Sequence, residues 1–587
     1  MRKRIAIINK QKCHPDECGN FLCAKLCPVN RAGSDCITED PIFRKARIDE
    51  YLCTGCGICP NRCPFGAIEI INLPETLNKS PIHRYGENMF ELYSLPSPLF
   101  GQVTGILGRN GIGKSTALKV MAGLIAPNLG NWNAVSNPKE VISYFKGTET
   151  QKFMEKLNKG EIQLSYKPQQ VDLIPKQATG TVRELLSKVD ASKRMEKVTL
   201  ELQLTHFLDT DISKISGGEL QRVAIAATVL KKANVYLFDE PSSYLDIKQR
   251  VNMARFVRTL ATETTSVMAI EHDLIILDFM TDFLNIMYGY EGAFGIVSGV
   301  KTTREGINAF LEGYLKEENV RFRSNPLKFE KIVDVHKGSR DQLVAWSSVV
   351  KKLGNFILRA EPGILHKGEI IGILGENGIG KTTFMKMLAG IEKPDTGSFD
   401  STCRVAYKPQ YLETSADVTV VEFMAHALEK FAHSIIKPLD LEKLFDQKLS
   451  SLSGGQLQRV AIAHCLSQEA ELFLLDEPSA YLDVEQRLII SKMIKQLTIE
   501  RDMTILVIDH DLMFLDYLAD KLMVFTGKPA REGIVRGPFK MEEGMNTFLT
   551  ELDITLRRDM GSHRPRINKP GSVKDKEQRS ANKWYYS

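Results

Sequence analysis

Two glycine-rich stretches, GRNGIGKST from Gly108 and GENGIGKTT from Gly375, have the residue types and spacing of a loop that binds nucleoside triphosphates. Glycines let backbone N–H groups turn toward the phosphates, at the positive end of the helix that follows. The lysine would reach the β- and γ-phosphates, and the next hydroxyl would bind Mg²⁺. The expected ATP-binding residues are Gly108, Asn110, Gly111, Gly113, Lys114, Ser115 and Thr116, then Gly375, Asn377, Gly378, Gly380, Lys381, Thr382 and Thr383.

Two apolar runs, VYLFDE and LFLLDE, each end in a pair of carboxylates, and two later apolar runs end in histidine. The aspartate of each pair is placed to hold Mg²⁺, and the glutamate to orient the attacking water. In isolation such acids, or a single histidine, would be structural, but their duplication favours catalysis. The predicted catalytic residues are Glu240, Glu477, His272 and His510, and the predicted Mg²⁺ ligands are Ser115, Gln169, Asp239, Thr382, Gln410 and Asp476.

These motifs belong to a long internal repeat, which fixes the elements that must position them. YKPQ occurs at 166 and 407, SGG-x-LQRVAIA at 216 and 453, and DEPS-x-YLD at 239 and 476, always in the same order. Each lysine loop follows an apolar, β-prone run and precedes a helical segment. We therefore expect two copies of one α/β domain, each with a strand–loop–helix that holds phosphate.

The first copy is longer than the second between the loop lysine and the YKPQ glutamine, so it carries an insertion at roughly 134–162. Gly147 can end one helix, Thr148 can cap the next, and Gly160 can close it. A helix–loop–helix is predicted. Its mixed lysines and glutamates favour a solvated surface element, with a contact surface for a partner as the alternative.

Nine of the eleven cysteines lie within the first 63 residues, eight of them in two runs that each end in C-x3-C-P. The second run has the spacing C-x2-C-x2-C-x3-C-P of bacterial ferredoxins, whose fourth cysteine binds the other of two clusters. Zinc is the competing interpretation, and Cys36 is a spare ninth cysteine. The expected ligands are Cys13, Cys18, Cys23 and Cys63 for one [4Fe–4S] cluster, and Cys53, Cys56, Cys59 and Cys27 for the other.

The 587-residue chain is too long for a single core, and its 25% charged and 43% hydrophobic residues are those of a globular protein. No run approaches eighteen apolar residues, and the basic start lacks the apolar stretch of a secretion signal. We expect a cytoplasmic protein with no membrane partner. Nine Lys and Arg against three Asp and Glu between 557 and 587 are compatible with an RNA-bearing partner or with a solvated tail.

The repeated motifs together resemble those of the ATP-binding cassette ATPases, since SGG-x-LQ is the signature of that superfamily. The resemblance implies that each signature completes the site of the other cassette, in a head-to-tail sandwich around two Mg-ATP. Ser216, Gly217 and Gly218 would complete the site of Lys381, and Ser453, Gly454 and Gly455 that of Lys114. Tyr85 and Phe90, with Phe356 in the second copy, are candidates either for adenine stacking or for core packing.

Twin cassettes behind a two-cluster, ferredoxin-like α+β domain resemble one family nearly end to end, the E-subfamily cassette proteins known as RNase L inhibitor or ribosome-recycling ATPase. The likeness includes HRYGEN, the insertion YFKGTETQKFMEKL and the tail RPRINKPGSVKDKEQ. It implies ATP-driven splitting of ribosomes with a release factor or its paralogue. Binding to the small subunit and its rRNA would follow, with initiation factors as further partners. An ATP-gated electron-transfer protein and a transporter ATPase are the alternatives.

The expected domains are an iron–sulfur domain at 1–75, a first cassette at 76–305 and a hinge at 306–330, then a second cassette at 331–545 and a second hinge with the basic tail at 546–587. A small domain stapled by two clusters would act as a rigid wedge. Candidates for contacting the opposite lobe or rRNA phosphates are Arg321, Arg323, Arg557, Arg558, Arg564 and Arg566.

Overall fold

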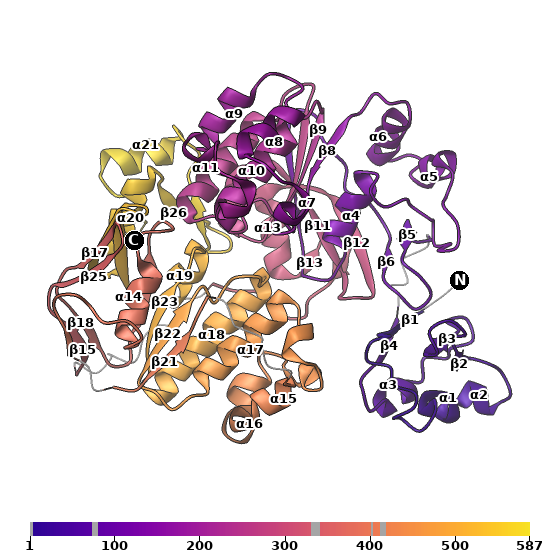
Figure 1. Ribbon diagram of the computed structural model, residues 1–587. Helices are drawn as coiled ribbons and strands as arrows, with labels where there is room; N and C mark the ends of the chain where they lie inside the picture. The colour runs from indigo at the N-terminus through magenta and orange to yellow at the C-terminus, as the bar shows by residue number, and fades with distance from the viewer. Residues whose placement is uncertain (1–3, 73–79, 330–340, 401–402, 411–417, 587) are drawn as a thin grey trace.

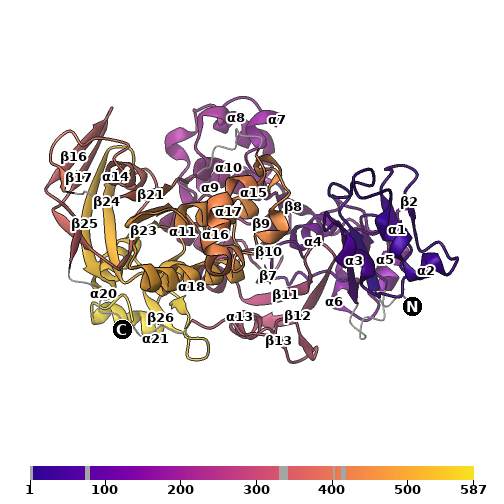
Figure 2. The same cartoon turned by 90° about the horizontal axis from the view of Figure 1, so that it is seen from below.

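The computed structural model describes residues 4–72, 80–329, 341–400, 403–410 and 418–586. A small N-terminal domain lies beside the first of two large α/β cassettes (Figure 1). Seen from below, that domain occupies one end of the molecule, and the C-terminal α20 and α21 lie near the other (Figure 2). None of the helices in the described residues is both long and apolar enough to cross a membrane.

The N-terminal domain has little regular structure to hold it together. β1 (Arg4–Ile8) pairs with β4 (Ile68–Asn72) and β2 (Ile37–Glu39) with β3 (Ala46–Ile48), both antiparallel. Three short helices, α1 (Leu22–Leu26), α2 (Pro28–Arg31) and α3 (Ile58–Arg62), complete it. Its core combines small aliphatic residues with cysteines. So small a core needs further staples.

The first cassette is built on an eight-stranded sheet in the order β5-β6-β12-β11-β7-β10-β9-β8. Its central strands are parallel and wholly buried, which explains their unbroken apolar runs. The strands are β5 (His83–Arg84), β6 (Glu91–Leu92), β7 (Val103–Leu107), β8 (Leu164–Lys167), β9 (Val235–Asp239), β10 (Ser266–Ile270), β11 (Phe283–Tyr290) and β12 (Phe294–Thr302). The helices that bear on function are α4 (Lys114–Met121), α10 (Gly217–Leu230), α11 (Ile247–Thr259) and α12 (Leu274–Met280).

The second cassette repeats this sheet as β16-β17-β25-β24-β19-β23-β22-β21, which confirms the predicted internal repeat. The strands are β16 (Val349–Leu353), β17 (Phe356–Ala360), β19 (Ile370–Leu374), β21 (Val405–Lys408), β22 (Leu472–Asp476), β23 (Thr504–Ile508), β24 (Lys521–Lys528) and β25 (Glu532–Lys540). The matching helices are α14 (Lys381–Leu388), α17 (Gly454–Leu466), α18 (Val484–Arg501) and α19 (Leu512–Leu518). A three-stranded sheet, β18 (Gly363–His366), β15 (Gln342–Trp346) and β20 (Phe399–Asp400), is added to it.

The insertion in the first cassette is a helix–loop–helix, as predicted, formed by α5 (Pro138–Tyr144) and α6 (Glu149–Asn158). Asn137 caps α5 in a capping box, whereas the Thr148 hydroxyl donates to Phe145 O rather than capping α6. Val141 and Phe153 join the core of the cassette, and Tyr144 Oη donates to the carbonyl of Tyr93 at 2.8 Å. The insertion is therefore anchored on one side only.

The segments expected to be hinges begin inside helices, because α13 (Thr303–Glu312) and α20 (Met541–Leu552) extend across 305 and 545. After α20 come β26 (Leu556–Arg558), β27 (Pro565–Ile567) and α21 (Val573–Ser580). Arg323 pairs with Glu485 of the second cassette at 3.3 Å, and Arg564 pairs with Asp278 of the first at 2.9 Å.

The tail arginines do not form one exposed basic surface. Arg564 is fully buried, and Arg566 binds the same aspartate, Asp278, through Nη2 at 3.0 Å. Arg558 lies 3.5 Å from Asp516 on α19. The buried members hold the tail to the cassettes, and among the candidates Arg321 and Arg557 are exposed. For Arg564 the structure favours the first of the two predicted roles, contact with the opposite lobe, because this guanidinium is buried against Asp278 of the first cassette and has no surface to offer a phosphate.

Candidate functional sites

The two phosphate-binding loops have the same geometry. Gly113 (φ +87°) and Gly380 (φ +91°) precede α4 and α14, in a conformation that favours glycine. Lys114 Nζ donates to the carbonyls of Gly108 at 3.0 Å and Arg109 at 2.6 Å, so its ammonium is held inside the loop. Lys381 Nζ makes the matching bonds to residues 375 and 376, both at 2.8 Å. Burial lowers the pKa of both lysines.

The candidate aromatic residues lie beside these loops. A Cβ on Gly113 would lie 2.5 Å from Phe90 Cζ, and one on Gly380 would lie 3.0 Å from Phe356 Cζ, so only glycine fits under either ring. Tyr85 Oη is 3.1 Å from the Thr116 hydroxyl. Both phenylalanines pack against the loop backbone while staying partly exposed, which leaves a face available to a base.

The aspartates at the ends of β9 and β22, Asp239 and Asp476, are both buried. Asp239 Oδ2 accepts from Tyr166 Oη at 3.1 Å, and its Oδ1 has no hydrogen-bond partner among the described residues. In the second cassette Thr382 Oγ1 donates to Asp476 Oδ2 at 2.8 Å. Burial raises the pKa of both carboxyls. A hydroxyl beside a buried carboxylate fits Mg²⁺, which takes one or two carboxylates together with phosphate oxygens.

Each predicted catalytic glutamate lies beside its predicted histidine. Glu240 Oε1 is 3.4 Å from His272 Nε2, and Glu477 Oε1 is 3.5 Å from His510 Nε2. Gln169 Nε2 also donates to Glu240 Oε1, at 2.8 Å. Burial alone would raise the pKa of Glu240, but the hydrogen bond and charge of the histidine, with the loop lysine, lower it to about 2. In the second cassette the equivalent groups, His510 and Lys381, lower the pKa of Glu477 to about 2, and Gln410 contributes a hydrogen bond.

Two pairs of polar residues beside these glutamates were missed in the sequence. Lys167 and Lys408, from the two YKPQ segments, donate to backbone carbonyls at the ends of β9 and β22. Gln221 and Gln458, from the two LQR segments, donate to the carbonyls of the glutamates. The signal was available, since both residues stand at the same point of both repeats.

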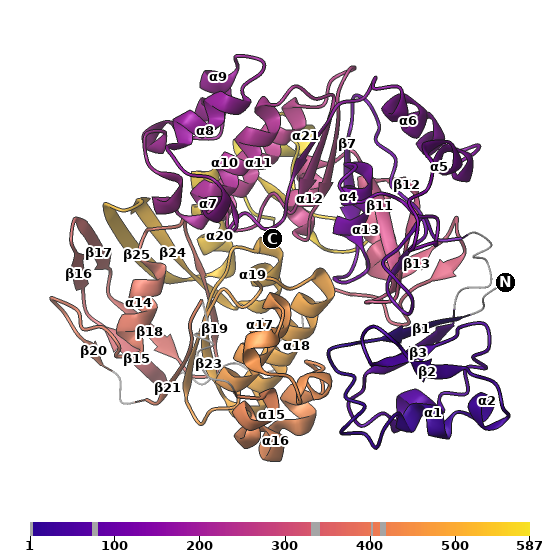
Figure 3. The same ribbon diagram turned by 45° about the vertical axis from the view of Figure 1, so that its right-hand side comes forward.

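The cassettes face each other head to tail (Figure 3). Asp483 Oδ2 of the second cassette accepts from Asn110 N in the first loop at 3.1 Å, and Asp246 Oδ2 of the first accepts from Asn377 N in the second loop at 2.9 Å. Glu291 lies beside Gly111 and is surrounded by the charges of Asp483 and of Arg459 on α17. Each loop is therefore covered by the opposite cassette, as the sandwich requires.

The signature segments form the N-termini of two helices. Ser216 caps α10 and Ser453 caps α17, each in a capping box, and both serines are exposed. A Cβ on Gly218 would lie 3.0 Å from the carbonyl of Tyr244, and one on Gly455 would lie 2.9 Å from that of Tyr481, so backbone passes close over both glycines. The exposed helix ends present free N–H groups, which suit phosphate.

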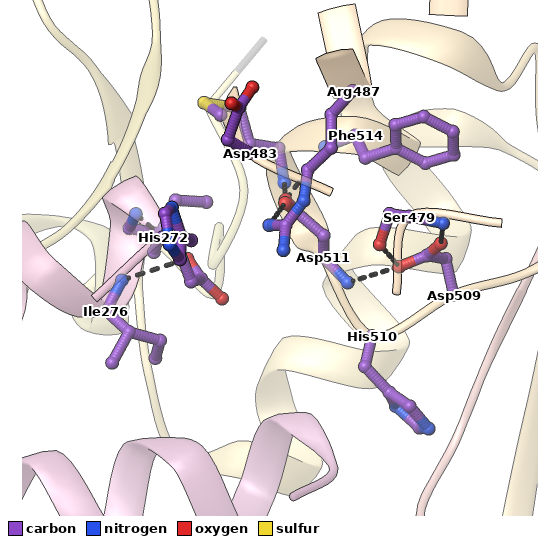
Figure 4. A network of polar contacts seen from close by, with 12 residues as sticks. His272, Ile276, Ser479, Asp483, Arg487, Asp509, His510, Asp511 and Phe514 are labelled. Carbon is purple, nitrogen blue, oxygen red and sulfur yellow. Dashed lines mark hydrogen bonds and ion pairs between the residues drawn. The ribbon is translucent and has the colours of Figure 1, made fainter. Parts of the chain in front are cut away.

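Beside the two histidines a cluster of acids and arginines joins the cassettes (Figure 4). Arg487 Nη1 donates to Asp511 Oδ2 at 2.5 Å, and Arg250 Nη1 donates both to Asp273 Oδ2 at 3.0 Å and to the carbonyl of His510 at 3.3 Å. Burial, and then the facing charge of Asp511, raise the pKa of Asp273 to about 6. The histidine of one site is therefore connected to the arginine of the other cassette.

The structure gathers the first predicted set of cysteines around one pocket, and it places the other cysteines of the second set, together with Cys23 of the first, around Cys59. One pocket is lined by Cys13, Cys18, Cys23 and Cys63 with Pro15, Phe21, Leu22 and Phe65. Around Cys59, burial and then the thiols of Cys53, Cys23, Cys56 and Cys27 raise its pKa to about 12. No three His, Cys, Asp or Glu side chains in the described ranges converge as a single metal ion would need. Four thiols around one pocket, in runs that end in C-x3-C-P, fit the four-cysteine ligation of a [4Fe–4S] cluster.

Cys36, the ninth cysteine, is buried beside these sets. Burial, and then neighbouring Cys27 and Cys53, raise its pKa well above the usual range, and its Sγ is 3.8 Å from the carbonyl of Asp49.

A buried ion network joins this domain to the first cassette. Arg84 Nη2 donates to both carboxylate oxygens of Glu50 at 2.9 Å, and its Nε lies 2.9 Å from Glu91 Oε1. All three side chains are at most 5% exposed. Lys12 Nζ donates to the carbonyl of Lys443 in the second cassette at 3.0 Å. The domain therefore contacts both cassettes.

Three family models match four parts of the chain. The model described as "ABC transporter" matches residues 100–243 and 363–480. "Possible Fer4-like domain in RNase L inhibitor, RLI" matches 4–35, and "4Fe-4S binding domain" matches 46–69. The chain thus contains two ABC ATPase domains that bind ATP, and 4Fe–4S domains precede them.

Relatives resemble the chain over its full length. "Translation initiation factor RLI1" of Saccharomyces cerevisiae is 43% identical, covering 99% of this chain and 98% of that protein. "Model of ribosome-bound archaeal Pelota and ABCE1" has a TM-score of 0.93 and 50% identity, covering 100% of this chain and 99% of that one.

The crystal structure of the complex of archaeal ribosomal stalk protein aP1 and archaeal ribosome recycling factor aABCE1 has a TM-score of 0.82 and 50% identity. It covers 86% of this chain and 99% of that one. The chain belongs to the E family of ATP-binding cassette proteins, the ABCE1 or RNase L inhibitor family.

Proposed function

We propose that this protein uses ATP to split ribosomes into subunits in the cytoplasm after termination or rescue, and then stays on the small subunit. Its partners are the small subunit with its rRNA, a release factor or its paralogue, and initiation factors. The observation that carries the proposal is that each phosphate loop is covered by the opposite cassette, while a buried ion network joins the N-terminal domain to the first cassette. Relatives described as ribosome-bound and as a recycling factor support it.

The chemistry is assigned to the chain's own residues in each site. Lys114 and Lys381 bind the β- and γ-phosphates, and Mg²⁺, when bound, neutralises charge on those phosphates. Glu240 and Glu477, ionised at neutral pH because their pKa is about 2, accept a hydrogen bond from water and orient it. His272 and His510 lie beside them, where the γ-phosphate would be sensed.

Two Mg-ATP would bind in total, one at each loop. Asp239, Ser115 and Gln169 would hold the first Mg²⁺, and Asp476, Thr382 and Gln410 the second. The signature segments Ser216–Gly218 and Ser453–Gly455 would bind the γ-phosphate of the opposite site.

The N-terminal domain is proposed to hold two [4Fe–4S] clusters and to act as the wedge. Cys13, Cys18, Cys23 and Cys63 would ligate one cluster and Cys53, Cys56, Cys59 and Cys27 the other. The clusters would supply the rigidity that a small core lacks. When the cassettes close, the N-terminal domain would therefore move with the first cassette as a rigid body, through the contact of Glu50 with Arg84, without itself deforming. The segments 306–330 and 546–587 would serve as hinges, since their arginines reach both cassettes.

The test is gradient sedimentation of purified ribosomes with the full-length chain and the release-factor paralogue. We expect subunits to appear with ATP, and one round of splitting with a non-hydrolysable analogue, because closure precedes hydrolysis. Whole ribosomes that persist in both conditions would exclude the proposal. Electron paramagnetic resonance during turnover separates the electron-transfer alternative, which requires the clusters to change redox state with ATP.

A further inference from the structure

A buried lysine occupies the same position in both cassettes and has no part in the phosphate loop. Lys167 ends β8 and Lys408 ends β21, and their side chains are 0% and 2% exposed. Burying an ammonium is costly unless hydrogen bonds compensate. Burial lowers the pKa of each to about 8. A residue retained in both sites despite that cost must have partners that need it.

Those partners are backbone carbonyls next to the proposed catalytic glutamates. Lys167 Nζ donates to the carbonyl of Asp239 at 3.0 Å and to that of Glu240 at 3.2 Å. Lys408 Nζ donates to the carbonyl of Asp476 at 2.7 Å. In both cassettes the lysine therefore fixes the backbone where the buried strand turns into the catalytic loop.

A second donor reaches the same backbone from the signature helix. Gln221 Nε2 on α10 donates to the carbonyl of Glu240 at 2.8 Å, and Gln458 Nε2 on α17 donates to that of Glu477 at 2.6 Å. Both glutamines are buried. The segment around the glutamate is thus held between a strand of its own sheet and the helix that begins with the signature.

The held backbone is strained. Glu240 has φ +48° and Glu477 has φ +47°, the left-handed region that non-glycine residues rarely occupy. Such a conformation is unfavourable for a non-glycine residue and persists only where surrounding contacts determine it. The same backbone sets the direction of the carboxylate, which lies 3.4 Å and 3.5 Å from the histidines.

We propose that Lys167 and Lys408 are positioning residues for ATP hydrolysis: together with Gln221 and Gln458 they hold each glutamate in its left-handed conformation and so aim its carboxylate. The glutamine belongs to the helix whose N-terminus would bind the opposite nucleotide. A shift of that helix on closure would therefore change the hold on the glutamate of its own site. This inference rests on the proposed catalytic role of Glu240 and Glu477.

The test is steady-state ATP hydrolysis by full-length Lys167→Met/Lys408→Met, a change that keeps length and removes the donor. We expect kcat to fall about 10- to 100-fold, since a misplacement of about 1 Å can cost 100-fold. KM and the affinity for a fluorescent ATP analogue should change less than twofold, because the phosphate loops are untouched. Lys176→Met, at an exposed position on α7 (Ile174–Gln177), is the matched control and should leave kcat unchanged.

Two further variants separate positioning from loss of folding. Gln221→Leu/Gln458→Leu removes the other donor and should also lower kcat with KM held. Adding Lys167→Met/Lys408→Met to Glu240→Gln/Glu477→Gln should lower the rate no further, because the lysines act through the glutamates. Three results would overturn the inference. They are wild-type kcat in the lysine variant, a rise in KM as large as the fall in kcat, and a full additional loss of rate when the lysine changes are added to Glu240→Gln/Glu477→Gln. If instead Glu240→Gln/Glu477→Gln hydrolyses normally, the proposed catalytic residues fail first.

Discussion

At one of the two positions where the phosphate loops differ, the loop residue forms an ion pair with the other cassette. The first loop reads GRNG and the second GENG. Arg109 lies 3.3 Å from Glu485 across the interface, and Glu376 lies 2.7 Å from Lys248. Lys248 and Glu485 are themselves equivalent, each two residues after the aspartate that caps the opposite loop. Both members of the ion pair therefore have the opposite charge at the second loop from the one they have at the first.

This reversal favours pairing of a first cassette with a second one. Two first cassettes would bring Arg109 against Lys248, and two second cassettes would bring Glu376 against Glu485. Like charges in such positions disfavour the wrong pairing. Around this asymmetric rim the chemical groups match closely, with glutamate–histidine distances of 3.4 Å and 3.5 Å. The two cassettes thus have matching glutamate–histidine pairs and differ in the charged residues that face the other cassette.

The largest expected effect is the loss of ATP hydrolysis when both glutamates are replaced, because the two cassettes share this residue. Glu240→Gln/Glu477→Gln should lower ATP hydrolysis by about 100- to 10,000-fold, the range for loss of a general base, while the neighbouring loops still bind ATP. Hydrolysis and binding of a fluorescent analogue measure the two effects. Each single variant, Glu240→Gln or Glu477→Gln, then shows how much of the ATP hydrolysis the unaltered site contributes. Wild-type hydrolysis by the double variant would contradict the assignment.

Among the described residues, a buried ion network joins the N-terminal domain to the first cassette but not to the second, so breaking this network tests that asymmetry. Arg84→Met removes the guanidinium that offsets the charges of the buried Glu50 and Glu91, which should cost about 3–5 kcal/mol. Differential scanning calorimetry should show an earlier transition, and iron content should fall. Arg44, which is 85% exposed and pairs with Glu39 at 3.3 Å, provides the control Arg44→Met. Equal stability of the two variants would show that the network does not hold the domain.

The reversed charges should give a smaller effect. Lys248→Glu places an acid against Glu376 and should raise the analogue concentration needed for closure about fivefold, since exposed pairs are worth at most about 1 kcal/mol. Crosslinking across the interface measures closure. The swap Lys248→Glu/Glu376→Lys restores opposite charges and should recover most of the loss. A swap as impaired as the single variant would show that local shape, not charge, matters here.

The repeat allowed the two α/β domains, the phosphate loops and the helix–loop–helix to be predicted, because each is visible in residue types and spacings close in sequence. The buried network of Arg84 and the burial of Arg564 were not predicted, since their partners stand 34 and 286 residues away. A basic tail looks exposed in sequence because composition does not show which arginines meet a buried acid. Lys167 and Lys408 were overlooked for a different reason. They lie within the two YKPQ motifs, and the predicted role of the glutamines, Gln169 and Gln410, already accounted for those motifs.

The smallest effect expected is a pH dependence of closure, centred on the aspartates that face each other beside the histidines. Asp273 has a pKa raised to about 6 by burial and by Asp511, with Glu271 adding to the rise and Arg250 opposing it. A carboxyl with a raised pKa binds more protons in the closed form, so closure should strengthen as pH falls from 7 toward 5. Arg487 offsets the charge of Asp511, which keeps the effect modest.

Asp273→Asn tests this directly, because asparagine can still accept from the N–H groups of Ile275 and Ile276 and cap α12 but cannot titrate. Closure with a non-hydrolysable analogue, followed by crosslinking between pH 5.5 and 7.5, should rise toward acid in the wild type and stay level in the variant. Asp209→Asn is the control, since Asp209 is exposed and pairs with Arg183 on the surface. A pH response that survives in Asp273→Asn would place the titrating group elsewhere. A response lost in both variants would exclude the facing aspartates as its specific cause.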